Sequence, residues 1–510
     1  MLAALLAINP VSMGLAMTTD EFAELERSIA TMQEDGSLAA ADATIRGTIN
    51  AGIELTTGQR QILEREIERS RRIRMDYSLT PDGLLEALGE RVKDFQVSDY
   101  EAWIADGRFD FKHIDDEMRF VGPSVSNLFK RYPELRARRL TLDTTEYEDF
   151  LAAHTKAVAE ELGDSAAITA KPHDFRLTMT ITLKPGNVPK GGIVKCWMPY
   201  PQQFESQSGV SLIESSPGPK WINPPTYPTR SLYFEQPSAG DEPTVFKATY
   251  SVSVNPRRVR IDEALVTQAE QEKFAGYEYF TAEQAPHVVF SERIRALVSE
   301  IVGAETNPAR KARLIYDWVS ANTVYSYARE YSTLRCIPEY VLENGYGDCG
   351  QIALLYITLC RAAGIPARWQ SGWIIYPMEV NLHDWTEIYL HPYGWIPVDP
   401  DYGVQLTHEF SDLDDATRRT LVDFFFGGLD AYRLTVNREH GYPHYPAKAD
   451  FRSDDVDFQR GELEHDGKNL YFDTFKYKMD VEYLTPGDKE ASDKAEVATP
   501  KPLLAPGMVR

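Results

Sequence analysis

The chain has 510 residues, and its 43% hydrophobic and 26% charged content is that of an ordinary folded protein long enough for two or three domains. Its 77 acidic and 54 basic residues give a formal net charge of -23 at pH 7, which repels polyanions. The composition therefore argues against nucleic acid and anionic lipid as partners.

The first 17 residues differ from the rest of the chain. The run MLAALLAINPVSMGLA has the apolar stretch and small-residue end of a secretory signal, although no Lys or Arg precedes it. We therefore predict a periplasmic or secreted protein; the alternative is that these residues form a disordered or helical tail of a cytoplasmic protein. No later run reaches the roughly 18 to 20 apolar residues that a membrane span requires, so no integral membrane segment is expected in the mature chain.

Residues 18–167 show helical periodicity and are predicted to form an N-terminal helical domain. Thr80 followed by Pro81 is typical of a helix start, and Ser98 with Glu101 matches a capping box. No chemistry is indicated in this region, so we favour a structural or partner-binding role for it.

From residue 174 the pattern becomes strictly alternating. The runs DFRLTMTITLKP and FKATYSVSV alternate apolar and polar residues, and residues 170–262 are predicted to form an antiparallel β domain. The run TFKYKMDVEY, in a return segment spanning 446–485, alternates in the same way and is predicted to join that β domain. Residues 486–510 are rich in Pro, Lys and Glu, which predicts a disordered tail.

Residues 280–445 are predicted to form the catalytic core. Within them, NGYGDCGQIALLYITLCRAAG places Asp348 as a helix N-cap, and the run from Cys349 is apolar on almost every side until Gly364. A thiol in the first turn of a helix lies near free N–H groups and partial positive charge, which favour the thiolate. Cys349 is therefore the candidate nucleophile.

The other thiols are given structural interpretations. Four cysteines, at irregular spacing, are too few for a disulfide framework or a zinc site. We expect Cys196 to pack inside the β domain and Cys360 to pack within the core helix. Cys336 is expected to be partly buried, and pairing with another cysteine would require an oxidising compartment.

A cysteine nucleophile needs a histidine to take its proton and a polar partner to orient that histidine. The run HDWTEIYLHPYGWIPVDPDYG reads as two strands joined by a hairpin turn at HPYG. His383 opens the first strand and Asp399 closes the second, so their side chains are expected at one end of a small sheet. The register is not fixed by sequence, and Asp401 is kept as a second candidate for the orienting role.

The segments GDCGQIALLYITLCRAAGIPAR, HDWTEIYL and GWIPVDP together resemble the core of the transglutaminase-like superfamily. The resemblance covers residues 310–403 and rests on a G-D-C-G turn, an H-x-W strand and a hairpin ending in V-D-P. It implies an α+β fold in which a papain-like core, with a helix packed on a small antiparallel sheet, accompanies the β and helical domains. It also implies Cys349 as nucleophile, His383 as base and Asp399 as orienting partner, with no metal and no organic cofactor.

Three aromatic residues are candidates for substrate binding. Trp385 matches the aromatic residue that the family has two positions after its histidine, and it either walls the substrate channel or packs in the core. Tyr325 and Tyr327 lie where family members often have an aromatic residue near the site. An oxyanion role beyond the Cys349 backbone N–H is left open.

The expected chemistry is acyl transfer on a peptide, protein or carboxamide substrate through a thioester on Cys349. Water as the second reactant gives hydrolysis, which we favour because water is always present. An amine as the second reactant gives cross-linking by a transglutaminase, which is the first alternative. A binding or scaffold protein that keeps the fold without chemistry is the second, although the presence of Cys349, His383 and Asp399 argues against it.

Overall fold

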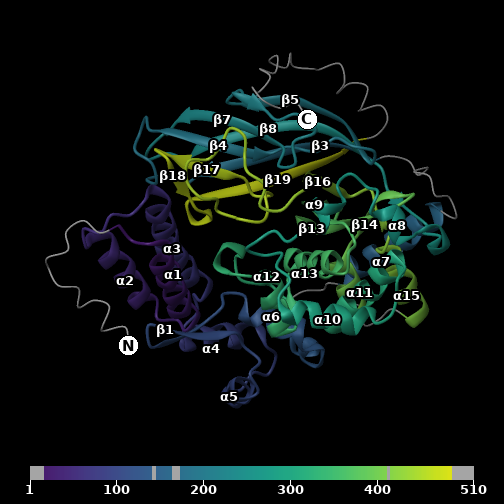
Figure 1. The fold of residues 1–510 in the computed structure, drawn as a ribbon, viewed down its shortest axis with the longest axis horizontal. Helices are drawn as coiled ribbons and strands as arrows, with labels where there is room; N and C mark the ends of the chain where they lie inside the picture. The colour runs from purple at the N-terminus through teal and green to yellow at the C-terminus, as the bar shows by residue number, and fades with distance from the viewer. Residues whose placement is uncertain (1–15, 141–144, 163–172, 410–413, 485–510) are drawn as a thin grey trace. The chain divides into compact units, whose positions relative to one another are not determined.

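The computed structural model describes residues 16–140, 145–162, 173–409 and 414–484 (Figure 1). The export signal predicted for residues 1–17 lies almost entirely outside the described residues, and the tail predicted for residues 486–510 lies entirely outside them. Within the described part of the chain, no helix combines the length and the apolar character needed to cross a membrane.

The described chain divides into two compact units. The first contains the residues up to 140 together with Tyr327–Leu334, and the second contains the others. The domain boundaries predicted from the sequence stay predictions, and the boundaries of the two compact units fall at other residues. Helix α7 (Thr145–Leu162), which we assigned to the N-terminal helical domain, lies in the second unit because it packs against α15 (Asp415–Phe424) and β9 (Arg257–Arg258).

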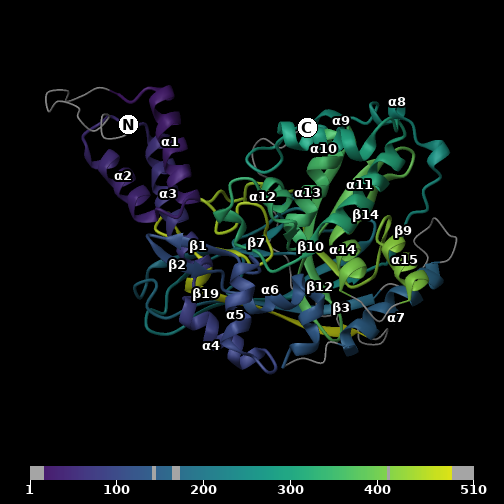
Figure 2. The same ribbon diagram turned by 90° about the horizontal axis from the view of Figure 1, so that it is seen from below.

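The first unit is mainly helical, and its first three helices lie side by side (Figure 2). Thr80 caps α4 as predicted, since its hydroxyl accepts the N–H of Gly83. The predicted capping box at Ser98 is wrong: the N-cap of α5 is Gln96, two residues earlier, and the N–H of Gln96 donates to Asp99. A short hairpin of β1 and β2 was not predicted. The elements are α1 (Thr19–Glu34), α2 (Leu38–Asn50), α3 (Thr57–Asp76), α4 (Pro81–Arg91), α5 (Val97–Ala105), β1 (Phe111–Ile114), β2 (Glu117–Phe120), α6 (Ser124–Arg131) and the 3₁₀ helix η2 (Pro133–Arg138).

The helices of this unit hold the segment Tyr327–Leu334 by side-chain contacts to its backbone and hydroxyl groups. The Arg69 guanidinium donates to the Ser332 carbonyl at 2.6 Å, and the Asp76 carboxylate accepts the Thr333 hydroxyl at 2.7 Å. Such bonds satisfy polar groups that burial would otherwise leave unpaired. The segment Tyr327–Leu334 is thus an integral part of the helical unit.

Two antiparallel sheets in the second unit share one hydrophobic core, and their strands lie together in Figure 1. One sheet has the order β19-β3-β8-β5 and the other the order β18-β17-β4-β7-β6. Strand β19 pairs with β3 along its whole length, from Phe475 opposite Leu183 to Leu484 opposite Asp174. The strands are β3 (His173–Leu183), β4 (Ile193–Pro199), β5 (Gln207–Ser216), β6 (Trp221–Ile222), β7 (Ser231–Pro237), β8 (Thr244–Val254), β17 (Glu462–His465), β18 (Lys468–Leu470) and β19 (Phe475–Leu484).

The remaining elements of the second unit build a helix-on-sheet core. Helix α13 packs against β12 and β13 of a four-stranded sheet ordered β14-β13-β12-β16, and α11 and α14 pack against α13. The structure therefore has the mixed helix and antiparallel-sheet fold predicted from the sequence. The elements are α8 (Gln268–Gln271), α9 (Tyr277–Thr281), α10 (Glu292–Val302), α11 (Pro308–Asn322), β10 (Val324–Tyr325), α12 (Ile337–Asn344), β11 (Tyr346–Gly347), α13 (Cys349–Ala362), β12 (Ala367–Ile375), β13 (Val380–Leu390), β14 (Gly394–Val398), α14 (Pro400–His408), α15, β15 (Gly428–Leu429) and β16 (Arg433–Asn437).

Gly372 is required where β12 runs closest to β16. A Cβ atom at this position would lie 1.7 Å from the Leu434 carbonyl oxygen, a backbone atom that cannot move aside. Gly372 also stands opposite His383 in the sheet, so a shift of β12 would reach the candidate site.

We expect Gly372→Ala to lower the free energy of unfolding by about 1–3 kcal/mol, the usual range for overpacking. Urea unfolding measures the loss, with Gly218→Ala as the control because a Cβ atom there meets nothing within 4 Å. Equal stability of the two variants would contradict the close approach of the strands.

Candidate active site

Cys349 is the first residue of α13, the helix that packs on the central sheet. The Asp348 carboxylate caps this helix by accepting the N–H of Gln351 at 3.0 Å, which confirms the predicted helix start. The Cys349 side chain is partly buried, and its Sγ lies 3.5 Å from Oδ2 of Asp384. The candidate nucleophile therefore has a carboxyl group as its hydrogen-bond partner.

The electrostatic surroundings of Cys349 differ from the sequence expectation. Burial raises the pKa of the thiol well above its usual value, and the negative charges of Asp384, Asp348 and Asp401 raise it further. A helix start by itself favours the thiolate, but at Cys349 burial and the charges of the nearby carboxylates act in the opposite direction. In this arrangement Cys349 is a protonated thiol at rest.

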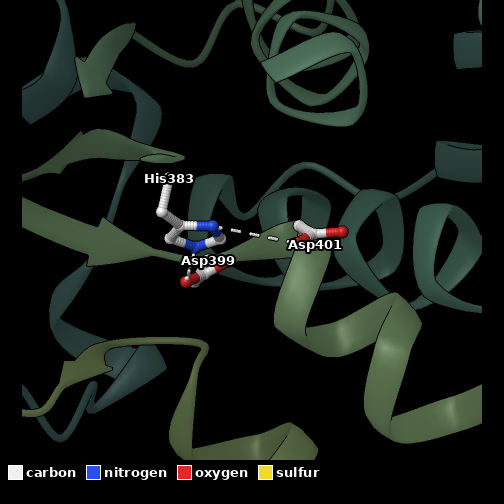
Figure 3. Close-up of side chains that lie close together, drawn as sticks. All are labelled: His383, Asp399 and Asp401. Carbon is white, nitrogen blue, oxygen red and sulfur yellow. Dashed lines mark hydrogen bonds and ion pairs between the residues drawn. The ribbon is translucent and has the colours of Figure 1, made fainter. Parts of the chain in front are cut away.

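His383 and Asp399 form a buried pair on the same sheet (Figure 3). His383 lies on β13 and Asp399 directly follows β14, and Nε2 of the ring is 2.8 Å from Oδ2 of the carboxylate. The structure thus brings these two predicted residues into contact. His383 lies inside β13 rather than at its start, because the strand already begins at Val380.

Asp399 has two structural tasks, one for each oxygen. Its Oδ1 accepts the N–H of Tyr402 at 3.0 Å and so caps α14, while Oδ2 faces His383 and lies 3.3 Å from Nη2 of Arg433. Burial alone would raise the pKa of Asp399, but the charges of His383 and Arg433 and these hydrogen bonds hold it below the usual value. Asp399 is therefore ionised and fixed in orientation.

Asp401, the second candidate for orienting the histidine, lies on the other side of the imidazole (Figure 3). Its Oδ2 is 3.9 Å from Nδ1 of His383 and accepts the Gln405 amide at 2.7 Å. Ring nitrogen Nε2 therefore belongs to Asp399, and Nδ1 is the nitrogen left for proton exchange. Donor atoms of His383, Asp399 and Asp401 lie within 4.8 Å of one another, but the guanidinium beside Asp399 opposes a metal cation there.

Burial lowers the pKa of His383 below its usual value, and the charge of Arg433 adds to this effect against the opposing charge of Asp399. The ring is enclosed by aromatic groups: its centroid lies 5.9 Å from that of Trp385 and 5.1 Å from that of Tyr402. A neutral imidazole can accept a proton, so His383 at rest is in the form that a general base requires.

The three predicted substrate-binding residues lie in different surroundings. Trp385 is only 1% exposed, and the cavity that it lines has a volume of about 20 Å³, which is room for a water molecule and not for a substrate group. Tyr325 pairs with Gly347 in a short parallel ladder, two residues before Cys349. Tyr327 belongs to the first unit, where its carbonyl accepts the Asn127 amide. The substrate contacts of these residues stay predictions, and the burial of Trp385 favours a packing role.

Four polar residues near the site were missed in the sequence. Asp384 is the middle residue of the H-x-W pattern, which specifies no residue type at that position. Gln459 and Asp457 come from the long connection between β16 and β17, and Arg433 begins β16. The run SDDVD in that connection was the available signal, since so many acidic residues next to apolar ones are unusual in a plain turn.

Asp457 couples the stability of this region to pH. Its buried carboxylate accepts the Ser371 hydroxyl, while burial and the charge of Asp454 raise its pKa to about 7 from the usual 3.8. Because the folded state binds this proton more tightly than the unfolded state, the stabilisation is complete below about pH 4 and is lost as the pH rises through 7.

We expect Asp457→Asn to remove the decrease in stability that the parent protein shows as the pH rises through 7. The variant should gain free energy of unfolding relative to the parent protein between pH 4 and pH 8, by on the order of 3–4 kcal/mol. Urea unfolding at several pH values measures the difference, with the exposed Asp480→Asn on β19 as control. The same pH dependence in the parent protein and the Asp457 variant would contradict the assignment.

A helix that begins with a cysteine and packs on an antiparallel sheet bearing a buried histidine–aspartate pair defines the class of papain-like α+β folds. Residues 295–400 match the family model of the transglutaminase-like superfamily, and this part of the chain is a transglutaminase-like domain.

Two bacterial relatives share sequence with the chain. An uncharacterized protein of Haemophilus influenzae is 25% identical over 321 residues, which cover 54% of this chain and 81% of the relative. The uncharacterized protein YebA of Bacillus subtilis is 26% identical over 142 residues, which cover 24% of this chain and 19% of YebA. The shared segment is thus most of the first relative and a small part of the second.

Two solved structures resemble the fold more distantly. A candidate cysteine protease from Cytophaga hutchinsonii has a TM-score of 0.42 at 17% identity and covers 62% of this chain and 92% of its own. The periplasmic domain of TgpA from Pseudomonas aeruginosa has a TM-score of 0.25 at 17% identity and covers 50% of this chain and 94% of its own. Both TM-scores fall below 0.5, and neither similarity establishes an activity.

Proposed function

We propose that the protein is a cysteine-dependent acyl-transfer enzyme that hydrolyses peptide or carboxamide bonds, with Cys349 as nucleophile, His383 as base and Asp399 as orienting partner. The observation that carries this proposal is the buried 2.8 Å hydrogen bond between His383 and Asp399, on the sheet against which the Cys349 helix packs. A nucleophile, a base and an orienting carboxylate on one helix-and-sheet core are the parts that such chemistry needs.

In the first half of the reaction, the Nε2–H group of His383 stays hydrogen-bonded to Asp399, and Nδ1 accepts the proton of the Cys349 thiol. The sulfur then attacks the substrate carbonyl carbon, and the carbonyl π electrons move to oxygen. The backbone N–H groups of Cys349 and Gly350 in the first turn of α13 are suited to bind that oxyanion. Collapse of the adduct breaks the C–N bond, and the imidazolium gives its proton to the departing amine.

The second half releases the acyl group from the thioester. Water enters in place of the amine, His383 takes one of its protons, and the resulting hydroxide attacks the thioester carbonyl. Breaking the C–S bond returns the proton to Cys349 and frees a carboxylic acid. Asp399 stays ionised throughout and stabilises the imidazolium that forms in each half.

The test is mass spectrometry of a peptide library incubated with the protein and a primary amine, with Cys349→Ala protein alongside. Cleaved or deamidated peptides that are absent with the variant would support hydrolysis. Peptides that gain the amine would identify an amine-accepting transglutaminase instead. No product with either protein would overturn the enzyme proposal in favour of a binding or scaffold role.

A matched control is Cys336→Ala. The Cys336 thiol is partly buried and donates to the His287 carbonyl, so its loss removes a cysteine without touching the proposed site. We expect this variant to retain the parent activity.

We also propose that the protein acts in the periplasm or outside the cell. The signal-like residues 1–17 support this location. Fractionation of cells that express the full chain tests it, because recovery of the protein only with cytoplasmic markers would contradict export.

A further inference from the structure

Asp384 lies between His383 and Trp385 on β13 and contacts the candidate nucleophile directly. Its Oδ2 is 3.5 Å from the Cys349 sulfur, and its Oδ1 accepts the side-chain amide of Gln459 at 2.7 Å. The carboxyl group is buried, so neither bond competes with bulk water. This buried side chain takes no part in the reaction described above.

Gln459 ties this carboxyl group to the backbone of the histidine. Its amide nitrogen donates both to Oδ1 of Asp384 and to the His383 carbonyl oxygen at 2.8 Å. The Gln459 side chain is itself buried. Two hydrogen bonds from one amide therefore fix where the Asp384 carboxylate sits relative to the base.

The charges around the pair are mainly negative. Burial raises the pKa of Asp384 well above its usual value, and the charges of Asp457, Asp348 and Asp454 raise it further. Asp401 on α14 acts on Cys349 in the same sense. Arg460 and Arg452 in the same connection offset part of this charge at Asp454, with Arg460 3.3 Å from the Asp454 carboxylate. A negative sulfur is thus opposed by carboxylates on β13, at the start of α13 and on α14.

We propose that Asp384, fixed by Gln459, is a positioning residue that holds Cys349 at rest as a protonated thiol hydrogen-bonded to Asp384 instead of to His383. The inference rests on the proposed function of Cys349. The thiol proton cannot be shared with His383 Nδ1 while it is donated to Asp384, so activation requires Sγ to exchange one partner for the other.

The parent protein provides the first measurement. Alkylation of Cys349 by iodoacetamide, followed by peptide mass spectrometry across a pH series, reports the thiolate of this residue alone. We expect its midpoint to lie above about 8.5, the value of an ordinary cysteine. A midpoint near or below neutrality would overturn the proposal without any variant.

Asp384→Asn keeps the shape of the side chain and removes its ionisable carboxyl group. We expect the alkylation midpoint to fall by about 1–3 pH units, which at pH 7 makes alkylation at least about tenfold faster. Asp480→Asn, on an exposed strand, is the control and should leave the profile unchanged. An unchanged or slower profile in Asp384→Asn would overturn the proposal.

Two further variants separate positioning from simple charge repulsion. Gln459→Ala should shift the midpoint in the same direction by a smaller amount, because Asp384 loses its anchor. The downward shift of the alkylation midpoint caused by Asp384→Asn should be smaller in the His383→Ala background, since the released thiol then has no imidazole to receive its proton. The inferred arrangement would be contradicted if Asp384→Asn shifted the alkylation midpoint equally with and without His383, or if Gln459→Ala left the midpoint unchanged.

Alkylation also separates this inference from the proposed function. If the peptide library gives no product while the Asp384 variant shifts the alkylation profile, then the enzyme proposal fails and the resting contact stands. If products form while the profile does not shift, then the enzyme proposal stands and the role of Asp384 is refuted.

Discussion

Replacing His383 with alanine is expected to lower kcat/KM, for any substrate found in the library experiment, by about 10²–10⁴-fold. The loss follows from the removal of the group that takes the thiol proton and later protonates the leaving amine. The matched control is His113→Ala on the exposed β1–β2 hairpin, which should retain full activity. Far-UV circular dichroism of both variants checks that the fold is kept.

Asp399→Asn refines the same prediction. Asparagine is as good a helix N-cap as aspartate, so α14 should keep its start while the charge beside His383 is lost. We expect a loss of kcat/KM of similar size to that of His383→Ala, because the imidazole loses the partner that fixes its tautomer and stabilises its charged form. Full activity in either variant, with Cys349→Ala inactive, would contradict the assigned roles.

The helix start and the hairpin were predictable because their signals are local. Asp348 before a continuous apolar run predicts a helix that begins at Cys349, and α13 begins there. The HPYG turn sets the pairing of β13 with β14, in which Thr386 stands opposite Val398. With that register, His383 and Asp399 necessarily come to the same end of the sheet.

The charged surroundings of the site were not predictable, because they come from residues far along the chain. Gln459 follows His383 by 76 residues and reaches it only through the long connection before β17. The raised pKa of Cys349 was not predictable for the same reason: its position on a helix can be read from sequence, whereas its burial and the nearby charges of Asp384 and Asp401 arise only in the folded chain. Local patterns identify reactive groups, and tertiary contacts decide their protonation.

Arg433→Met is expected to lower the free energy of unfolding by about 3–5 kcal/mol, the range for breaking a buried ion pair from one side. The guanidinium is 3% exposed and lies 3.3 Å from Asp399 and 3.7 Å from Asp430, over the Tyr402 ring. Its removal leaves two buried carboxylates without a cation, and methionine fills the space without replacing the charge. Urea unfolding measures the loss.

Two variants decide whether the loss comes from the buried charge. Arg176→Met breaks a partly exposed pair with Glu482 and should cost no more than about 1 kcal/mol. Adding Asp430→Asn to Arg433→Met should restore part of the lost stability, because one unpaired carboxylate is then neutral. If Arg433→Met costs no more than Arg176→Met, the guanidinium is not what balances Asp399. The low pKa of that carboxylate would then need its hydrogen bonds from His383 and Tyr402 alone.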